Sequence, residues 1–198
     1  MLTIASIVEG HGEVEALPIL LRRIAETVTP ATPILVPRPI RVKRQRVVKL
    51  GELERYVQLA GVRAGDGGAI LILLDAEKDC PATLGAELLQ RARRARPDRS
   101  IRTVLAKAEY ESWFIAAVES VVGRPDLAIT PPMDPESIQD AKGWLSRNAL
   151  SRGTYRPTRH QARFTAALDL DAARSAPSFD KLWRDVASLL LPPAGNAE

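Results

Sequence analysis

The stretch Ala69-Ile-Leu-Ile-Leu-Leu-Asp75 decides the fold class of this 198-residue chain. Its first six residues are all apolar, so neither face of the strand that they form is suited to water. That pattern is typical of a central strand in a parallel sheet covered on both faces by helices. The strand ends at an acid, Asp75, which begins a polar turn. Because ligands of open α/β sheets bind beyond the carboxyl ends of the strands, this ending is also a candidate site.

Strand and helix patterns alternate on both sides of this stretch. Leu2–Val8 and Ser100–Ala106 are short, apolar segments that we interpret as two further strands. Apolar residues recur at helical spacing in four segments, residues 14–28, 50–64, 81–96 and 110–122. Residues 34–36 are expected to form a short strand, and residues 40–48 another strand or an irregular arm. The order predicts a mainly parallel sheet with right-handed crossovers, flanked by helices.

The character of the sequence changes after Gly123. Residues 124–135 hold four prolines and no apolar period, and short helical patterns follow at residues 136–150, 158–168 and 179–191. We therefore expect two parts: a Rossmann-like α/β core over residues 1–123, and a helical C-terminal appendage over residues 124–198 that packs on it.

Composition narrows the function classes. Hydrophobic residues make up 45% of the chain, enough for a packed core. The single cysteine, Cys80, excludes an internal disulfide and argues against a cysteine-based zinc site. No apolar run is long enough to span a membrane and no signal peptide is evident, so we expect a cytoplasmic protein. The net charge of +4 suits an anionic partner such as nucleic acid without requiring one.

Acidic residues follow all three predicted strands. They are Glu9 and Glu13, then Asp75, Glu77 and Asp79, and finally Glu109 and Glu111. If the strands are neighbours, these carboxylates meet at one edge of the sheet and repel one another unless protons or a cation neutralise them. Oxygen ligands without cysteine or histidine favour Mg²⁺ or Mn²⁺ over zinc. The pattern therefore predicts a metal site suited to phosphoryl or phosphodiester chemistry.

Each acid also has a structural interpretation. Asp79, just before Pro81, has the position of a helix N-cap, and Asp75 that of a turn former. Glu13 in a first helical turn would complement the helix dipole. Any one of these acids alone is more often structural than catalytic, and only the three acidic strand ends together favour a metal site.

Three segments carry a resemblance to a known family. Glu9-Gly-His-Gly-Glu13 after the first strand resembles the first TOPRIM motif, and Asp75-Ala-Glu77-Lys-Asp79 resembles its Asp-x-Asp motif. With Glu111-Ser-Trp113, the chain resembles the DUF4276 family, small bacterial TOPRIM-like proteins related to the TOPRIM domains of OLD-family nucleases. One departure is Glu77, which stands where the motif has aspartate and extends its carboxylate by one methylene.

The resemblance implies roles for these residues. Glu9 would be the acid/base and a metal contact, and Asp75 and Glu77 would hold Mg²⁺ or Mn²⁺, which makes these three the expected catalytic residues. Supporting metal ligands would be Glu13, Asp79 and Glu111, with Glu111 preferred to Glu109 because it precedes Ser-Trp.

A basic segment lies between the first two acidic groups. Its cationic residues, which alternate with apolar ones, include Arg41, Lys43, Arg44, Arg46 and Lys49. They are candidates for contacts with nucleic-acid phosphates. An equally weighted alternative is an edge strand whose charges prevent aggregation.

Three functions remain open at this point. The first is a Mg²⁺-dependent TOPRIM-like nuclease that hydrolyses phosphodiester bonds in DNA or RNA, within a defence or mobile-element system. The second is a non-catalytic TOPRIM-like module that partners an ATPase. The third is a small phosphatase or nucleotidyl transferase that uses the same acids on a mononucleotide.

Overall fold

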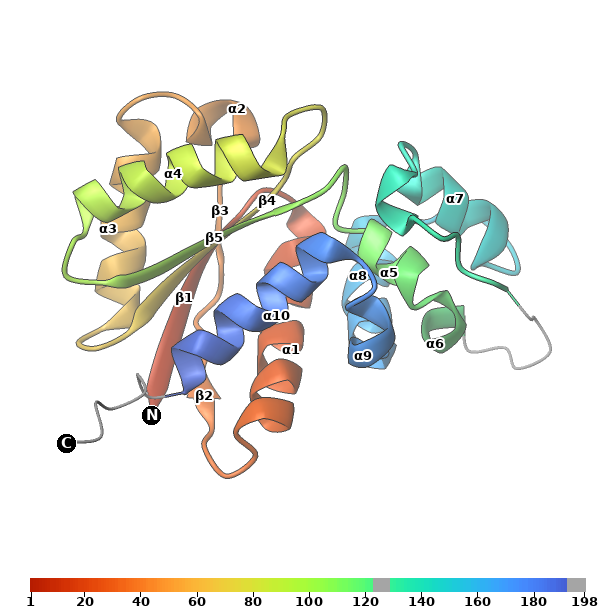
Figure 1. Cartoon of the computed structure of the whole chain (residues 1–198), viewed down its shortest axis with the longest axis horizontal. Coiled ribbons are helices and arrows are strands. Elements are labelled where there is room, and N and C mark those ends of the chain that lie inside the picture. Colours follow the sequence, from red (N-terminus) through yellow and green to blue (C-terminus); the bar gives the residue numbers. More distant parts are fainter. Residues whose placement is uncertain (123–128, 192–198) are drawn as a thin grey trace.

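The computed structural model describes residues 1–122 and 129–191, which form an α/β fold around a parallel sheet (Figure 1). The strands are β1 (Leu2–Val8), β2 (Ile34–Leu35), β3 (Ile40–Arg41), β4 (Ala69–Asp75) and β5 (Ser100–Ala106). Their order is β2-β1-β4-β5, with β3 also paired to β1, and every pair is parallel. The predicted Rossmann-like fold class, with a mainly parallel sheet flanked by helices, is confirmed.

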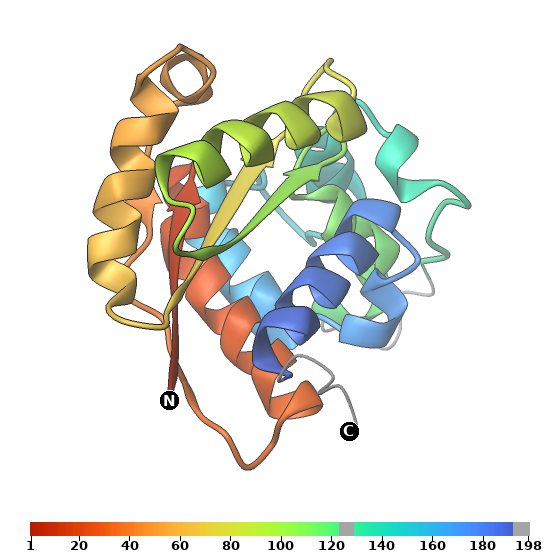
Figure 2. The same cartoon turned by 60° about the vertical axis from the view of Figure 1, so that its left-hand side comes forward.

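Both faces of the sheet are covered, as the sequence of β4 predicts. Ile70, Ile72 and Leu74 point to one face and Leu71 and Leu73 to the other, because side chains alternate along a strand. The first face packs on α3 (Glu52–Ala64) and α4 (Pro81–Ala95), and the second on α1 (His11–Val28) and α10 (Pro177–Leu190) (Figure 2). The central strand is therefore buried throughout its apolar length.

The C-terminal region is helical in the residues that the structure describes. Its elements are η1 (Pro135–Ser137), α7 (Ala141–Asn148), α8 (Pro157–Ala167), α9 (Leu170–Ala173) and α10. They share a hydrophobic core with α1 and one face of the sheet, and α8 packs along α1. The division predicted after residue 123 falls outside the described residues, so it stays a prediction.

Two local predictions differ from the structure. Residues 40–48 were expected to form a strand or an irregular arm, but the strand is limited to β3, and α2 (Arg44–Val47) follows it. One helical turn brings the buried Val47 into the core beneath α3, which an extended arm would not do. Residues 110–122 form two short helices, α5 (Ser112–Ala116) and α6 (Val118–Val122), because the chain leaves helical geometry at Ala117.

No helix among residues 1–122 and 129–191 combines the length and the apolarity needed to cross a membrane. The carboxyl ends of β1, β4 and β5 lie at the same edge of the sheet, with Val8 beside Leu73 and Asp75 beside Ala106. The loops that follow these strands therefore meet, and the site described next lies among them.

Candidate metal centre

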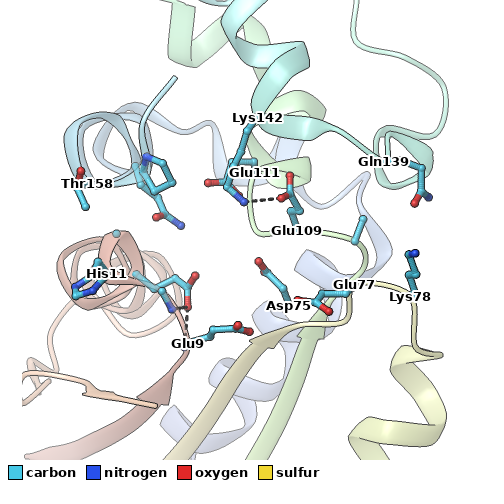
Figure 3. Close-up of a pocket in the computed structure, with 16 residues that line it drawn as sticks. Glu9, His11, Asp75, Glu77, Lys78, Glu109, Glu111, Gln139, Lys142 and Thr158 are labelled. Atoms are coloured by element: carbon cyan, nitrogen blue, oxygen red, sulfur yellow. Dashed lines mark hydrogen bonds and ion pairs between the residues drawn. The ribbon is translucent and has the colours of Figure 1, made fainter. Parts of the chain in front are cut away.

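A cleft of about 570 Å³ opens at the carboxyl edge of the sheet. Three of its walls are the loops after β1, β4 and β5, and the fourth comes from α7 and α8 (Figure 3). Six acids line it: Glu9, Glu13, Asp75, Glu77, Glu109 and Glu111. The structure thus brings together five of the predicted metal ligands, adds Glu109 to them, and leaves Asp79 outside the cleft lining.

The turn after β1 holds Glu13 in a fixed position. Glu13 Oε2 accepts hydrogen bonds of 3.1 Å from the backbone N–H groups of Glu9 and Gly10, at the start of α1. Glu13 thus caps the start of α1, beyond the interaction with the helix dipole expected from the sequence. Burial, followed by the charges of Glu111 and Glu9, outweighs these bonds and raises the pKa of Glu13 to about 7. The carboxyl is therefore half protonated near neutral pH.

Glu9 lies beside Glu13 and reaches further into the cleft. Its Oε2 is buried and has no hydrogen-bond partner in the described part of the chain. Burial raises the pKa of Glu9, and the charge of Glu77 adds to this effect. A buried carboxylate oxygen without a donor is costly, so this atom is well suited to a cation or a proton.

Asp75 ends β4 at the centre of the acidic group. Its Oδ1 accepts a hydrogen bond of 2.8 Å from the N–H of Tyr110, which links the β4 and β5 loops. Burial raises the pKa of Asp75 well above its ordinary value, and the charges of Glu13 and Glu111 raise it further. A nearby positive charge would therefore stabilise the ionised form of Asp75.

Two non-glycine residues at the mouth of the cleft have left-handed backbone conformations. Glu77 has φ 51° and Ala108 has φ 61°, and the N–H of Glu77 donates to the carbonyl of Ala108 at 3.2 Å. Such conformations cost on the order of 1 kcal/mol each and persist where surrounding contacts impose them. Here they join the β4 and β5 loops and set the direction of Glu77, which stays largely exposed.

A lysine from the C-terminal region enters the acidic group. Lys142, on α7, places Nζ 2.5 Å from Glu109 Oε1 and 3.3 Å from Glu111 Oε2 (Figure 3). Burial works against its charge, but Glu111, Glu109 and Asp75 together raise the pKa of Lys142 above its ordinary value. Burial raises the pKa of Glu111, although Lys142 opposes this. Sequence reasoning missed Lys142, since nothing near it in the sequence marks it as a partner of these acids.

Arg44 holds the outer side of the β4 loop. Its Nε donates to the carbonyl of Asp75 at 3.1 Å, and its guanidinium pairs with Asp79 and lies 3.8 Å from Glu77. Asp79 does not cap α4, whose N-cap residue is Cys80. Both Arg44 and Asp79 thus stabilise the loop that carries Asp75.

The other residues of the basic segment lie outside the cleft lining. Arg41, Lys43, Arg46 and Lys49 are exposed. Arg46 pairs with Glu52 at 2.8 Å and lies over the ring of Tyr56. The segment is therefore a solvent-facing basic strip beside the β4 loop.

The wall opposite the acids is made by α8 against α1. Gly12 packs so closely on this helix that an added Cβ would lie 1.9 Å from Gln161 Oε1 and 2.9 Å from Pro157 Cβ. Gln161 is buried and lines the cleft with Thr158. Sequence reasoning gave neither residue a role, because only the packing of α8 brings them to the first acidic turn.

The acids fit a hard divalent cation in their chemistry. All the donors are oxygens, burial and mutual repulsion raise several of their pKa values, and Glu9 Oε2 and Glu109 Oε2 lack partners in the described part of the chain. In residues 1–122 and 129–191, no three acidic, histidine or cysteine side chains are already grouped to enclose an ion. Ligation therefore requires these carboxylates to rotate within the cleft.

Comparison with known proteins identifies the family. The family model described as a domain of unknown function (DUF4276) matches residues 8–187. Because the match spans most of the chain, the chain belongs to the DUF4276 family. No curated protein and no solved structure matches it.

Proposed function

We propose that this protein is a Mg²⁺- or Mn²⁺-dependent hydrolase of phosphodiester bonds in nucleic acid. The observation that carries the proposal is the meeting of acids from three strand ends in one cleft. Burial and like charge raise the pKa values of Glu9, Glu13 and Asp75 there. A site that disfavours its own negative charge gains free energy when a divalent cation binds.

The residues of the cleft divide between metal binding and proton transfer. Asp75 and Glu9 are the proposed main ligands, and Glu77 reaches the same ion from the mouth of the cleft. A bound ion would stabilise charge on the phosphate and activate a water. Glu9, the acid/base that the motif resemblance implies, would accept a proton from that water. Hydrolysis by water needs no tyrosine nucleophile.

The surface charge supports a nucleic-acid substrate. The exposed cations Arg41, Lys43 and Lys49 lie on the segment whose Arg44 contacts the Asp75 loop. They can contact phosphates outside the cleft while the acids act on one bond. A role in defence or in mobile elements and a cytoplasmic location are expectations from the sequence.

The test is cleavage of labelled single- and double-stranded DNA and RNA in Mg²⁺ and Mn²⁺. We expect metal-dependent cleavage that Glu9→Gln and Asp75→Asn abolish without lowering the melting temperature. Glu15→Gln is the matched control, since Glu15 lies on the exposed side of α1 and pairs with Arg38 at 3.0 Å. Full metal-dependent cleavage by either cleft variant would rule out this mechanism.

A second candidate function is a non-catalytic binding module, and one observation favours it. The ammonium of Lys142 already neutralises part of the negative charge of the acids, so this part of the charge needs no metal ion. In this case the acids serve the fold, and the surface binds a partner, which the resemblance suggests is an ATPase. Absence of heat on titration with millimolar Mg²⁺ or Mn²⁺ would favour the module over the hydrolase.

A further inference from the structure

Lys142 brings a positive charge from the C-terminal region into the acidic cleft. It lies on the first turn of α7, a helix whose N-terminus is capped by Asp140, so its position does not depend on the acids alone. Its Nζ lies between Glu109 and Glu111, which follow β5, and its charge also acts on Asp75. The ammonium is thus a fixed positive charge on the β5 side of the acidic group.

Because Lys142 pairs with two of the acids in the cleft, fewer carboxylates remain to bind metal ions. Lys142 engages Glu109 and Glu111, and Arg44 lies near Glu77 at the mouth of the cleft. Among the residues that the structure describes, Glu9, Glu13 and Asp75 have no lysine or arginine partner, and Glu77 joins them from the mouth of the cleft, whereas Glu109 keeps only its Oε2 free of Lys142. Oε2 of Glu13 and Oδ1 of Asp75 already accept backbone N–H groups. A pair of ions, which lie about 3.5–4 Å apart in two-metal sites, needs carboxylates on both sides. The acids outside the reach of Lys142 come from the ends of β1 and β4, whereas Lys142 contacts both acids that follow β5.

We propose that the cleft binds one divalent cation, on the side of Glu9 and Asp75, and that the Lys142 ammonium stands where a second ion would otherwise bind. The inference rests on the proposed metal-dependent function and specifies its metal count. Two divalent ions beside an ammonium would repel it, and removal of Lys142 would release two carboxylates to bind a second ion.

The ammonium also has capacity for a substrate. Lysine has three N–H donors. One donates to Glu109 and the ammonium pairs with Glu111 at 3.3 Å, so a donor remains for a phosphate oxygen. A phosphodiester in the cleft would therefore lie between the bound ion on one side and Lys142 on the other. The two positive charges together match the charge that develops on the phosphate in hydrolysis.

The experiment counts manganese ions in the full chain. Wild-type protein, Lys142→Gln and Lys107→Gln are titrated with Mn²⁺ by calorimetry, and Mn²⁺ electron paramagnetic resonance separates single ions from coupled pairs. We expect one uncoupled ion per wild-type chain and two coupled ions per Lys142→Gln chain. Lys107 is the matched control, because it is an exposed lysine that pairs with Asp134 at 3.8 Å, and its variant should bind one ion.

Each result bears on a different claim. Two ions in the wild-type chain, or one ion in a folded Lys142→Gln chain, would overturn the inference. If Lys142→Gln does not fold, the wild-type count alone decides. No Mn²⁺ binding by wild-type protein would instead reject the proposed function. The double variant Lys142→Gln with Glu109→Gln should return to one ion, since it loses a carboxylate of the second site.

Discussion

Two cations hold the acidic loops, one from outside and one from within. Arg44 pairs with Glu77 and Asp79, whose side chains are 60% and 56% exposed. Lys142 pairs with Glu111, which is 2% exposed, and with Glu109, which is 25% exposed. The chemistry of the two contacts is alike, but their surroundings differ. Water screens the acids of the Arg44 group, whereas the acids of the Lys142 group depend on their lysine.

This difference separates structural acids from candidate functional ones. Asp79, the acid of the Arg44 group that lies outside the cleft lining, can be removed with little effect on its neighbours, because solvent replaces what it supplies. The buried acids cannot ionise freely without a positive charge beside them. The four predictions below test this contrast, and they run from the largest expected effect to the smallest.

The stability of the metal-free protein should fall as pH rises through the interval from 4.5 to about 7. The pKa of Glu13 is raised from 4.5 to about 7 in the folded chain, so the folded state binds more protons than the unfolded state in this interval. At about 1.4 kcal/mol per pH unit, Glu13 alone would lower the free energy of unfolding by about 3 kcal/mol. Urea unfolding in chelator between pH 5 and pH 8 measures this.

Glu13→Gln is the control for the pH experiment. Glutamine keeps an oxygen that can accept the N–H groups of Glu9 and Gly10 but carries no charge. Its pH profile should be shallower than that of the wild-type chain. Equal slopes in the two proteins would show that Glu13 ionises normally in the folded state.

Lys142→Gln should destabilise the metal-free protein more than Arg44→Gln does. Loss of one partner from a fully buried ion pair costs about 3–5 kcal/mol, and because the Lys142 side chain is 37% exposed we expect about 2–3 kcal/mol. For Arg44→Gln we expect about 1 kcal/mol, since its acids are exposed. Urea unfolding at pH 7 measures the free energy of unfolding of both variants. An equal loss in the two would contradict the proposed difference between the Arg44 and Lys142 contacts.

Gly12→Ala should destabilise the packing of α8 against α1, which forms one wall of the cleft. Its Cβ would collide with Pro157 and Gln161, and such overpacking costs about 1–2 kcal/mol. Gly85→Ala is the matched control: it adds a Cβ inside α4 that meets only Leu105 Cδ1, at 3.4 Å, so it should be neutral or stabilising. Thermal unfolding compares the two, and a neutral Gly12→Ala would mean that α8 is displaced easily.

Asp79→Asn should have the smallest effect of the four. Its side chain is exposed and lies outside the cleft lining, so we expect a stability change below about 1 kcal/mol and unchanged Mn²⁺ affinity. Asp75→Asn in the same titration should lose most of the binding. If Asp79→Asn weakens binding as much as Asp75→Asn does, Asp79 is a ligand, as the motif resemblance implied.

The sequence was informative wherever a local pattern determines the structure. Short, largely apolar or β-branched segments predicted β1, β4 and β5 to within a residue, and the acids that follow them predicted most of one side of the cleft. The strand expected within residues 40–48 proved to be only the two residues of β3, and the turn of α2 was not predicted, because it depends on the burial of Val47 rather than on propensity. The break at Ala117 likewise follows from packing in the aromatic core.

The other side of the cleft could not be read from local patterns. Lys142 and Gln161 become site residues only because α7 and α8 fold back onto α1 and the β5 loop. Nothing in their immediate sequence distinguishes them from surface lysines and glutamines. The division of acids into exposed and buried groups also depends on this packing, so the motif placed Asp79 beside Asp75 without showing that it faces Arg44.

The packing of the C-terminal helices on α1 has a consequence for the order of events during synthesis. A ribosome makes all six acids of the cleft before it makes Lys142, and Gln161 emerges later still. Domains fold as units when enough of the chain is available. Until α7 and α8 arrive, the strand ends of the nascent chain carry acids that only protons and dissolved cations can offset. The helices of the last third of the chain therefore complete the cleft around a sheet edge whose acids otherwise repel one another.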